Sequence, residues 1–166
     1  ITCVGNNDGE VTLNISGGTE SFTVSVDGGM AKPINRNDVI GGLSSGDHSL
    51  RITDANGCFV EIMSGVISEP TAVQVSLVSK KETACDDVKG SATVMASGGT
   101  GTTYTYTWYD DQNMVVSTLA SASNLSVGAY RVVAKDENDC ASPDFTVNIA
   151  SVALPDIQLV SRTTAS

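Results

Sequence analysis

Hydrophobic and polar residues alternate over short stretches of this chain, and each stretch ends at a cluster of glycine, serine, asparagine or aspartate. Val11, Leu13 and Ile15 alternate with polar neighbours until Ser16–Thr19 interrupts the pattern. A period of two residues is typical of a β-strand with one buried face. The other stretches are Phe22–Val26, His48–Ile52, Phe59–Ile67, Val73–Leu77, Ala92–Ala96, Tyr104–Trp108, Tyr130–Ala134, Phe145–Ile149 and Ile157–Leu159. Helical periodicity over three turns is missing, so the pattern predicts an all-β chain.

The whole pattern occurs twice, with an offset of 82 positions. Gly42–Cys58 recurs as Asn124–Cys140, and Cys3 and Cys85 are also 82 positions apart. Self-similarity at a fixed period indicates a tandem array, and closely spaced strands and turns are typical of β-sandwiches. We therefore expect two tandem immunoglobulin-like β-sandwich modules, residues 1–69 and 70–153. Residues 154–166 are expected to form a junction strand that leads into a next repeat of a longer protein.

The middle of each period is irregular. Residues 30–41 and 112–123 occupy the same place in the two repeats, but their sequences diverge. We expect one or two short strands in each of them. Because loops on a rigid sandwich commonly carry binding residues, these segments are also candidates for recognition.

The four cysteines have a regular arrangement. Cys3 and Cys58 are 55 positions apart, and so are Cys85 and Cys140. Close pairs of the C-x-x-C kind, which a tetrahedral metal site would use, are missing. The spacing predicts one disulfide in each module, worth about 4 kcal/mol in the entropic model. Such a bond requires Cα atoms within about 7 Å, so Cys3 and Cys58 should share one end of their module, with four strands between them.

The net charge and the cysteines indicate to which classes of protein this chain can belong. Residues 3–84 carry ten acidic and five basic residues, and residues 85–166 carry nine and four, which gives the net charge of −10. An acidic surplus in each repeat argues against nucleic-acid binding, which needs clusters of lysine and arginine. Structural disulfides are typical of exported proteins. No apolar run is long enough to insert this fragment into a membrane.

Acidic side chains beside one turn in each repeat are candidates for binding Ca²⁺. The candidates are Asp54, Asn56, Asp136, Asn138 and Asp139. Carboxylate and amide oxygens are calcium ligands, but Asp and Asn in turns also bind their own backbone. The turn interpretation is the one we favour. Asn6–Glu10 faintly resembles a calcium loop, without the full ligand spacing.

Three aromatic residues lie on one face of a predicted strand: Tyr104, Tyr106 and Trp108. Such a stripe can stack on sugar rings, but it more often packs in a core, with the tryptophan against a disulfide. Phe22, Val24 and Val26 replace the three rings in the first repeat, which favours the core interpretation.

The single histidine, His48, is replaced by Tyr130 in the second repeat. A catalytic base is not expected at a position that a tyrosine can occupy, and we expect no Ser–His–Asp arrangement. The position instead suits a tyrosine corner at the start of a strand. We therefore expect no enzymatic activity.

The order of these motifs resembles the SprB-type repeat of giant gliding adhesins and other cell-surface proteins of flavobacteria, a relative of PKD and other immunoglobulin-like modules. The second repeat carries the motifs in Ser97–Thr100, Tyr104–Trp108, Asn124–Tyr130 and Asp136–Cys140. The first repeat keeps Ser16–Thr19 and Asp54–Cys58 but has Val26 for the tryptophan and His48 for the tyrosine. The resemblance implies type IX secretion, a location on the bacterial cell surface, and adhesion during gliding motility.

Two functions remain open at this point. In the first, the modules are disulfide-linked stalk elements of an adhesin and have neighbouring repeats as their partners. In the second, the repeats themselves bind a surface polysaccharide weakly and gain avidity from their number. Divergence at residues 30–41 and 112–123 favours the stalk, because a repeated binding site should repeat its residues.

Overall fold

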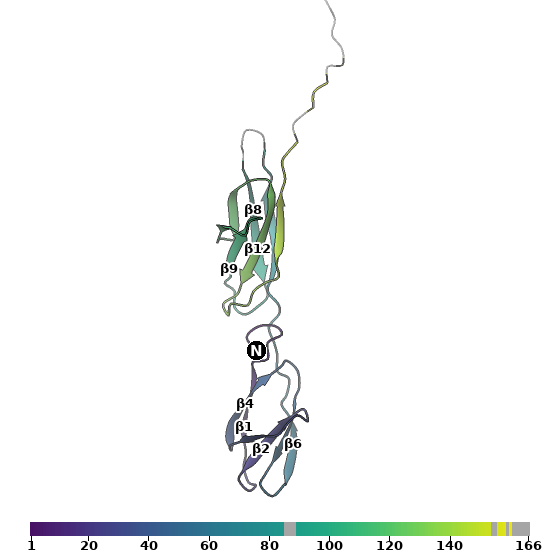
Figure 1. Ribbon diagram of the computed structural model, residues 1–166, viewed down its shortest axis with the longest axis vertical. Helices are drawn as coiled ribbons and strands as arrows, with labels where there is room; N and C mark the ends of the chain where they lie inside the picture. Colours follow the sequence, from purple (N-terminus) through teal and green to yellow (C-terminus); the bar gives the residue numbers. More distant parts are fainter. Residues whose placement is uncertain (85–88, 154–155, 159, 161–166) are drawn as a thin grey trace, which may run out of the picture. The chain divides into compact units, whose positions relative to one another are not determined.

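The computed structural model describes residues 1–84, 89–153, 156–158 and 160, and its regular elements are all β-strands (Figure 1). The chain divides into two compact units. Unit 1 comprises Ile1–Ala72, Gly98–Thr102 and Asp136–Cys140, and unit 2 comprises Val73–Ser97, Thr103–Lys135 and Ala141–Ser166. Among the described residues, no helix has the length and the apolar character that crossing a membrane requires.

Unit 1 contains two antiparallel sheets. One sheet pairs β1 (Gly9–Asn14) with β4 (Asn37–Leu43), and the other has the order β3 (Lys32–Ile34), β2 (Phe22–Val26), β5 (Ser49–Thr53), β6 (Phe59–Met63). Alternate residues of both sheets point inward, as their period of two predicts. The buried core consists of Leu13, Phe22, Val24, Leu50 and Ile52.

Unit 2 has one strand more. Its three-stranded sheet has the order β11 (Ser121–Leu125), β8 (Gly90–Ser97), β7 (Gln74–Lys81). The four-stranded sheet has the order β10 (Val115–Ser117), β9 (Thr105–Tyr109), β12 (Gly128–Lys135), β13 (Phe145–Ile149). Both sheets contribute to one core, made of Ala92, Val94, Trp108, Ala122, Leu125, Tyr130, Val132, Val147 and Ile149. Sheets of three and four antiparallel strands around a shared core form an immunoglobulin-like sandwich.

The predicted all-β class is confirmed, and each alternating stretch from Val11 to Ile149 contains a strand. The described residues of the stretch Ile157–Leu159 contain none. The two divergent middle segments each contain short strands, β3 and β4 in unit 1 and β10 and β11 in unit 2. The strand β7 pairs with β8, so it belongs to the sheet of unit 2. Most of the predicted junction strand at 154–166 lies outside the described residues, and the module limits at 69/70 and 153/154 stay a prediction.

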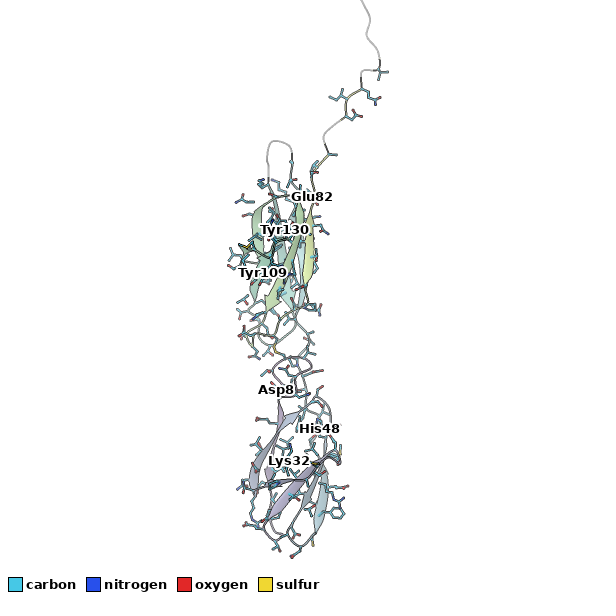
Figure 2. All side chains as sticks on the ribbon, viewed as in Figure 1. Asp8, Lys32, His48, Glu82, Tyr109 and Tyr130 are labelled. Atoms are coloured by element: carbon cyan, nitrogen blue, oxygen red, sulfur yellow. A yellow bond between two sulfur atoms is a disulfide. The ribbon has the colours of Figure 1, made fainter. Side chains whose placement is uncertain are left out.

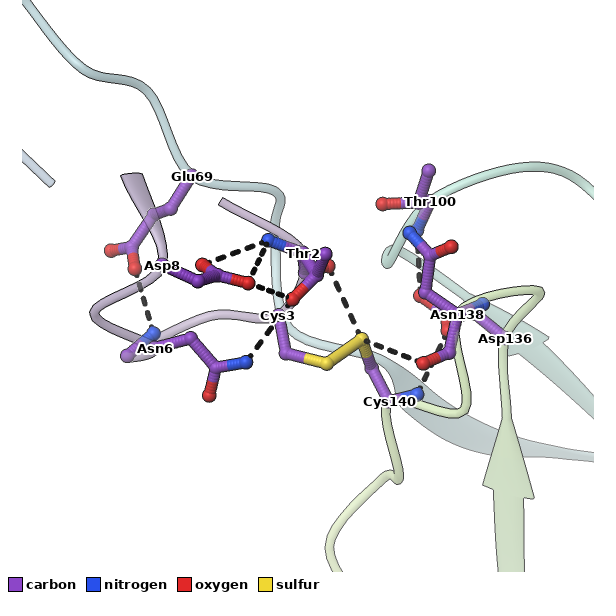
Figure 3. Close-up of a disulfide and its surroundings, with 10 residues drawn as sticks. Thr2, Cys3, Asn6, Asp8, Glu69, Thr100, Asp136, Asn138 and Cys140 are labelled. Atoms are coloured by element: carbon purple, nitrogen blue, oxygen red, sulfur yellow. Dashed lines mark hydrogen bonds between the residues drawn. A yellow bond between two sulfur atoms is a disulfide. The ribbon is translucent and has the colours of Figure 1, made fainter. Parts of the chain in front are cut away.

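The cysteine pairing differs from the prediction. Cys3 is bonded to Cys140, with a Cα–Cα distance of 5.6 Å, and Cys58 is an exposed free thiol (Figure 3). The predicted Cys3–Cys58 and Cys85–Cys140 bonds are therefore wrong as pairs, while Cys85 itself lies outside the described residues. Beside the bond, the Asp8 carboxylate accepts the N–H and the hydroxyl of Thr2.

The error has a topological cause. Five strands, β1 to β5, run between Cys3 and Cys58, and an odd number of strand crossings places two residues at opposite ends of a sandwich. The backbone of Ala55 donates to the carbonyl of Thr19 at 3.1 Å, so the turn that carries Cys58 lies where β1 ends. Cys3 precedes the start of β1. Because the short edge strand β3 makes a full crossing, the expected four strands become five.

Candidate functional site

The turn between β5 and β6 is held by one carboxylate. Oδ1 of Asp54 accepts the backbone N–H groups of Asn56 and Cys58, each at 2.9 Å. Oδ2 accepts the N–H of Thr19 at 3.0 Å, and the amide of Asn56 donates to the Thr19 hydroxyl. These hydrogen bonds hold the pKa of Asp54 below its usual range, with the Thr19 N–H as the largest cause.

The same arrangement recurs at Asp136 (Figure 3). Its Oδ1 accepts the N–H groups of Asn138 and Cys140 at 2.9 Å, and its Oδ2 accepts the N–H of Thr100 at 2.7 Å. The Thr100 N–H is again the largest cause that lowers the pKa of the carboxyl.

Two of the predicted calcium candidates, Asp54 and Asp136, bind backbone N–H groups, as the turn interpretation expects. Within the described residues, no group of three or more His, Cys, Asp or Glu side chains is placed to hold a metal ion. Calcium binding by Asn56, Asn138 and Asp139 stays a sequence prediction.

His48 occupies a tyrosine-corner position. Its Nε2 lies 3.1 Å from the carbonyl oxygen of Ser44, four residues earlier. The Tyr130 hydroxyl donates to the carbonyl of Ser126 at 3.1 Å, also four residues earlier. Figure 2 labels both side chains, His48 in unit 1 and Tyr130 in unit 2. The Nδ1 of His48 lies 2.7 Å from the carboxylate of Asp27. The two side chains therefore tie the start of equivalent strands, β5 and β12, to the preceding loop.

The contacts of His48 also form an Asp–His–Ser arrangement that the sequence analysis did not expect. The Ser44 hydroxyl lies 3.4 Å from Nε2, farther than the Ser44 carbonyl at 3.1 Å. Hydrogen bonding to Asp27, and then to the Ser44 carbonyl, raises the pKa of His48. The Ser44 carbonyl can only accept, so the nearer contact of Nε2 directs an N–H at that oxygen and offers no lone pair to the Ser44 hydroxyl.

The aromatic stripe lies mostly inside unit 2. Trp108 is fully buried, and its Nε1 donates to the carbonyl of Leu119 at 2.9 Å. Tyr106 packs against the same core, and its hydroxyl oxygen accepts the N–H of Ala96 at 3.0 Å. Tyr104, just before β9, is half-buried. A ring platform across all three residues therefore does not face solvent. Among the described residues, the core cluster around Trp108 contains no cysteine. Cys85 lies outside the described residues, so packing of the tryptophan on a disulfide stays a prediction.

The divergent middle segments line a hollow in each unit. In unit 1 the hollow has a volume of about 420 Å³, and its apolar lining residues include Val24, Val26 and Ile34. In unit 2 the hollow has a volume of about 550 Å³, and it is lined mainly by polar residues, Ser117, Ser121, Ser123, Asn124 and Ser126 among them. The two hollows therefore differ in the chemistry of their lining.

One surface in unit 1 escaped the sequence analysis. Every residue of β6 is exposed, and the apolar ones are Phe59, Val60, Ile62 and Met63. The guanidinium of Arg51 lies 3.7 Å from the ring centre of Phe59, a cation–π contact. The sequence pattern predicted a strand here, but periodicity alone does not tell whether another element covers its face.

A comparison with models of known protein families supports the resemblance to the SprB repeat. The SprB repeat model matches residues 1–31 and 80–113. The two matched segments end 82 residues apart, which is the period of the cysteines. The resemblance to the SprB repeat is thereby confirmed in both repeats. No protein with a curated description is significantly similar in sequence.

Several solved structures resemble the chain in strand arrangement. The fibronectin(III)-like modules of CbhA from Clostridium thermocellum are 14% identical, with 96% of this chain and 94% of that chain covered and a TM-score of 0.44. The IgVJ-C2 molecule of amphioxus is 12% identical, with coverages of 90% and 99% and a TM-score of 0.42. A C-terminal fragment of intimin, solved with the intimin-binding domain of Tir, is 15% identical, with coverages of 87% and 52% and a TM-score of 0.38. Similarity at this level assigns no function.

Proposed function

The chain carries two SprB repeat segments, and from that premise we propose that it forms stalk modules of a secreted adhesin on the bacterial cell surface. The modules, residues 1–69 and 70–153 with a junction strand at 154–166, have neighbouring repeats as their partners. The parent protein leaves the cell by type IX secretion and acts in surface adhesion and gliding motility.

One observation carries the stalk proposal: the residues that recur in both repeats are used for folding. Asp54 and Asp136 hold equivalent turns through three backbone N–H groups each. His48 and Tyr130 both tie a strand to the loop before it. The hollows, by contrast, differ in chemistry between the units. The residues that recur in both repeats thus support a shared role in folding.

Binding measurements test this proposal. We expect the chain, immobilised on beads at high density, to show no saturable binding to a panel of bacterial and algal polysaccharides. A reduced and alkylated sample serves as the unfolded control. Saturable binding that disappears in the control would overturn the stalk proposal, because recognition would then reside in the folded repeats.

The proposed location on the cell surface can be tested separately. Antibodies raised against the chain should label intact, unpermeabilised cells that express the parent protein, and the label should disappear after mild surface proteolysis. Labelling that requires permeabilised cells would contradict a surface location.

The alternative function, weak multivalent carbohydrate binding, is favoured by the polar hollow of unit 2. Its serine hydroxyls and the amide of Asn124 are groups that can bond sugar hydroxyls. Ser123→Trp would fill this hollow and should abolish any binding to the polysaccharide panel. Ser79→Trp, on an exposed position of β7 outside the hollow, is the matched control and should leave binding intact.

A further inference from the structure

The apolar hollow of unit 1 lies between its two sheets, at the edge formed by β3 and β4. Residues of β2 and β3 line one side of it, and Asp38–Gly41 of β4 line the other. In unit 2 the strand β7 packs on β8, β12 and β13, which correspond to β1, β5 and β6 by their order along the chain. A strand placed as β7 is would therefore leave this hollow open. Its volume of about 420 Å³ is in the range of sites for small molecules.

The equivalent place in unit 2 holds the side chain of Trp108. Val26 pairs with Leu50, and Trp108 pairs with Val132 at the equivalent position. The indole of Trp108 is fully buried, whereas Val26 is half-buried and lines the hollow. Because the two strands present these side chains in the same register, the second repeat shows which group this part of the sandwich can enclose. That group is an indole ring.

Two neighbouring exchanges change the volume in opposite directions. Val24, which also lines the hollow, occupies the position of Tyr106 in unit 2. The pairing of β4 with β1 and of β11 with β8 places Ile40 where unit 2 has Ala122. One larger aliphatic side chain does not replace two aromatic rings, so space remains in unit 1 between the sheets.

Two charged residues also line the hollow, Lys32 and Asp38. The carboxylate of Asp38 accepts the backbone N–H groups of Asn35 and Val39, each at 3.0 Å, so it serves the local backbone. Lys32, labelled on unit 1 in Figure 2, is exposed. An ammonium group near the face of an aromatic ring attracts it through a cation–π contact. Apolar walls with a cation beside them therefore favour an aromatic ring over an aliphatic group of the same size.

We propose that the hollow of unit 1 binds a free small molecule that carries a planar aromatic ring of about the size of indole. The ring lies beside Val26, in the place that the side chain of Trp108 has in unit 2, and the ammonium group of Lys32 lies over its open face. This binding site goes beyond the proposed stalk function. The two proposals are independent, because the stalk proposal is tested with polysaccharides and this one with aromatic rings.

Titration of the whole chain with indole, followed by NMR of the backbone amides, tests the site. We expect saturable shifts at the amides of β2, β3 and β4 that border the hollow. Val26→Phe and Val26→Trp fill the hollow from within, so each should weaken indole binding about tenfold or more, because the ring loses its buried surface. Ser79→Trp, at an exposed position of β7, is the matched control and should leave the affinity unchanged.

Thermal melting first establishes that each variant is folded. If the tryptophan of Val26→Trp does not fit between the sheets, the smaller ring of Val26→Phe decides. Unchanged affinity in a folded Val26→Phe chain would overturn the proposal, and so would an unmodified chain that shows no saturable shifts around the hollow.

Substitution of Lys32 tests the chemical class of the ligand. Lys32→Gln should weaken indole binding about threefold, the usual size of an exposed cation–π contact, and Lys32→Arg should retain it. Lys32 is exposed, so neither change should alter thermal melting. Equal affinities of the unmodified chain and Lys32→Gln, or of phenol and cyclohexanol for the unmodified chain, would refute an aromatic ligand. Tighter binding of the peptide glycyl-tryptophyl-glycine than of indole would point to a side chain of a partner protein and would refute a free small molecule.

Discussion

At the scale of single residues, the most informative side chain is the aspartate that precedes the turn after β5 and β12. Asp54 and Asp136 each accept three backbone N–H groups. A carboxylate can do this because its two oxygens offer about four acceptor sites. Two of the bonds close the turn, and the third fixes the Gly-Gly-Thr loop of the same sandwich end. The recurrence of aspartate is therefore explained by folding.

Replacement of Asp136 by asparagine tests this explanation. Asp136→Asn keeps the shape of the side chain but turns an N–H₂ group or a neutral oxygen toward the Thr100 N–H. We expect a lower melting temperature by calorimetry, and a smaller decrease for Asp54→Asn, because Asp136 is more deeply buried. Millimolar Ca²⁺ should leave the melting temperature of the unmodified chain unchanged. A calcium-dependent rise that Asp136→Asn abolishes would show that the turn is a metal site.

His48 gives unit 1 a dependence on pH. The pKa of His48 is raised, mainly by Asp27, and the pKa of Asp27 is lowered, mainly by His48. A raised histidine pKa contributes stability that is complete below the ordinary value of 6.5 and is lost as the pH rises through the folded-state pKa. A lowered aspartate pKa contributes stability above 3.8 that is lost in acid. The pair should therefore stabilise unit 1 most between these two values.

Thermal melting of the chain and of His48→Tyr, measured from about pH 4 to pH 9, checks this prediction. The substitution introduces the residue found at the equivalent position of unit 2, Tyr130, so a hydroxyl can still reach the Ser44 carbonyl. We expect the melting temperature of the unmodified chain to fall above neutral pH relative to the variant. Parallel pH profiles would exclude the pair as the cause.

At the scale of elements, β2 and β9 occupy equivalent positions in the two repeats but differ in their core residues, most of all at Val26 and Trp108. Val26 pairs with Leu50, and Trp108 pairs with Val132 at the equivalent position. Trp108 is fully buried, whereas Val26 lines the hollow of unit 1. The indole thus fills space in unit 2 that the smaller side chain leaves open in unit 1. The same strand pattern supports two differently packed cores.

Truncation at this position should have unequal effects. Trp108→Ala should lower the free energy of unfolding of unit 2 by about 3–5 kcal/mol, the usual loss for a buried aromatic residue. Val26→Ala, the matched change in unit 1, should cost about 1 kcal/mol or less, because its side chain borders an existing hollow. Denaturant titration followed by circular dichroism measures both. Equal losses would mean that the two positions are equally packed.

At the scale of the whole molecule, the disulfide links the two sequence repeats. Cys3 and Cys140 are 137 residues apart. In the entropic model, a closed loop of this length restricts the unfolded chain by about 5 kcal/mol. The bond therefore couples the unfolding of segments that lie far apart in the sequence.

Peptide mapping without reduction decides the pairing. We expect Cys58 to react with an alkylating reagent in the folded chain, and the peptides of Cys3 and Cys140 to remain linked. The double variant Cys3→Ser/Cys140→Ser should be less stable by about 2–5 kcal/mol. A linked Cys3–Cys58 peptide would restore the pairing that the cysteine spacing predicted.

The sequence by itself determined the strands, the period of 82 residues and the resemblance to the SprB repeat. Alternation is a local property, and the two copies of Asp-x-Asn-x-Cys indicate the same turn whatever surrounds it. The burial of Trp108 was also predictable, because valine replaces it at the equivalent position. These features depend on residues that are near one another in the sequence or at one fixed offset.

Only the tertiary structure decided the cysteine pairing, the contacts of His48 and the exposure of β6. The pairing depends on whether β3 makes a full crossing, and a three-residue strand gives almost no signal in the sequence. Asp27 and Ser44 meet His48 from different connections, which no local pattern reports. The exposure of Val60 and Ile62 was not predictable either, because the alternation of a strand is the same whether its face is covered or not.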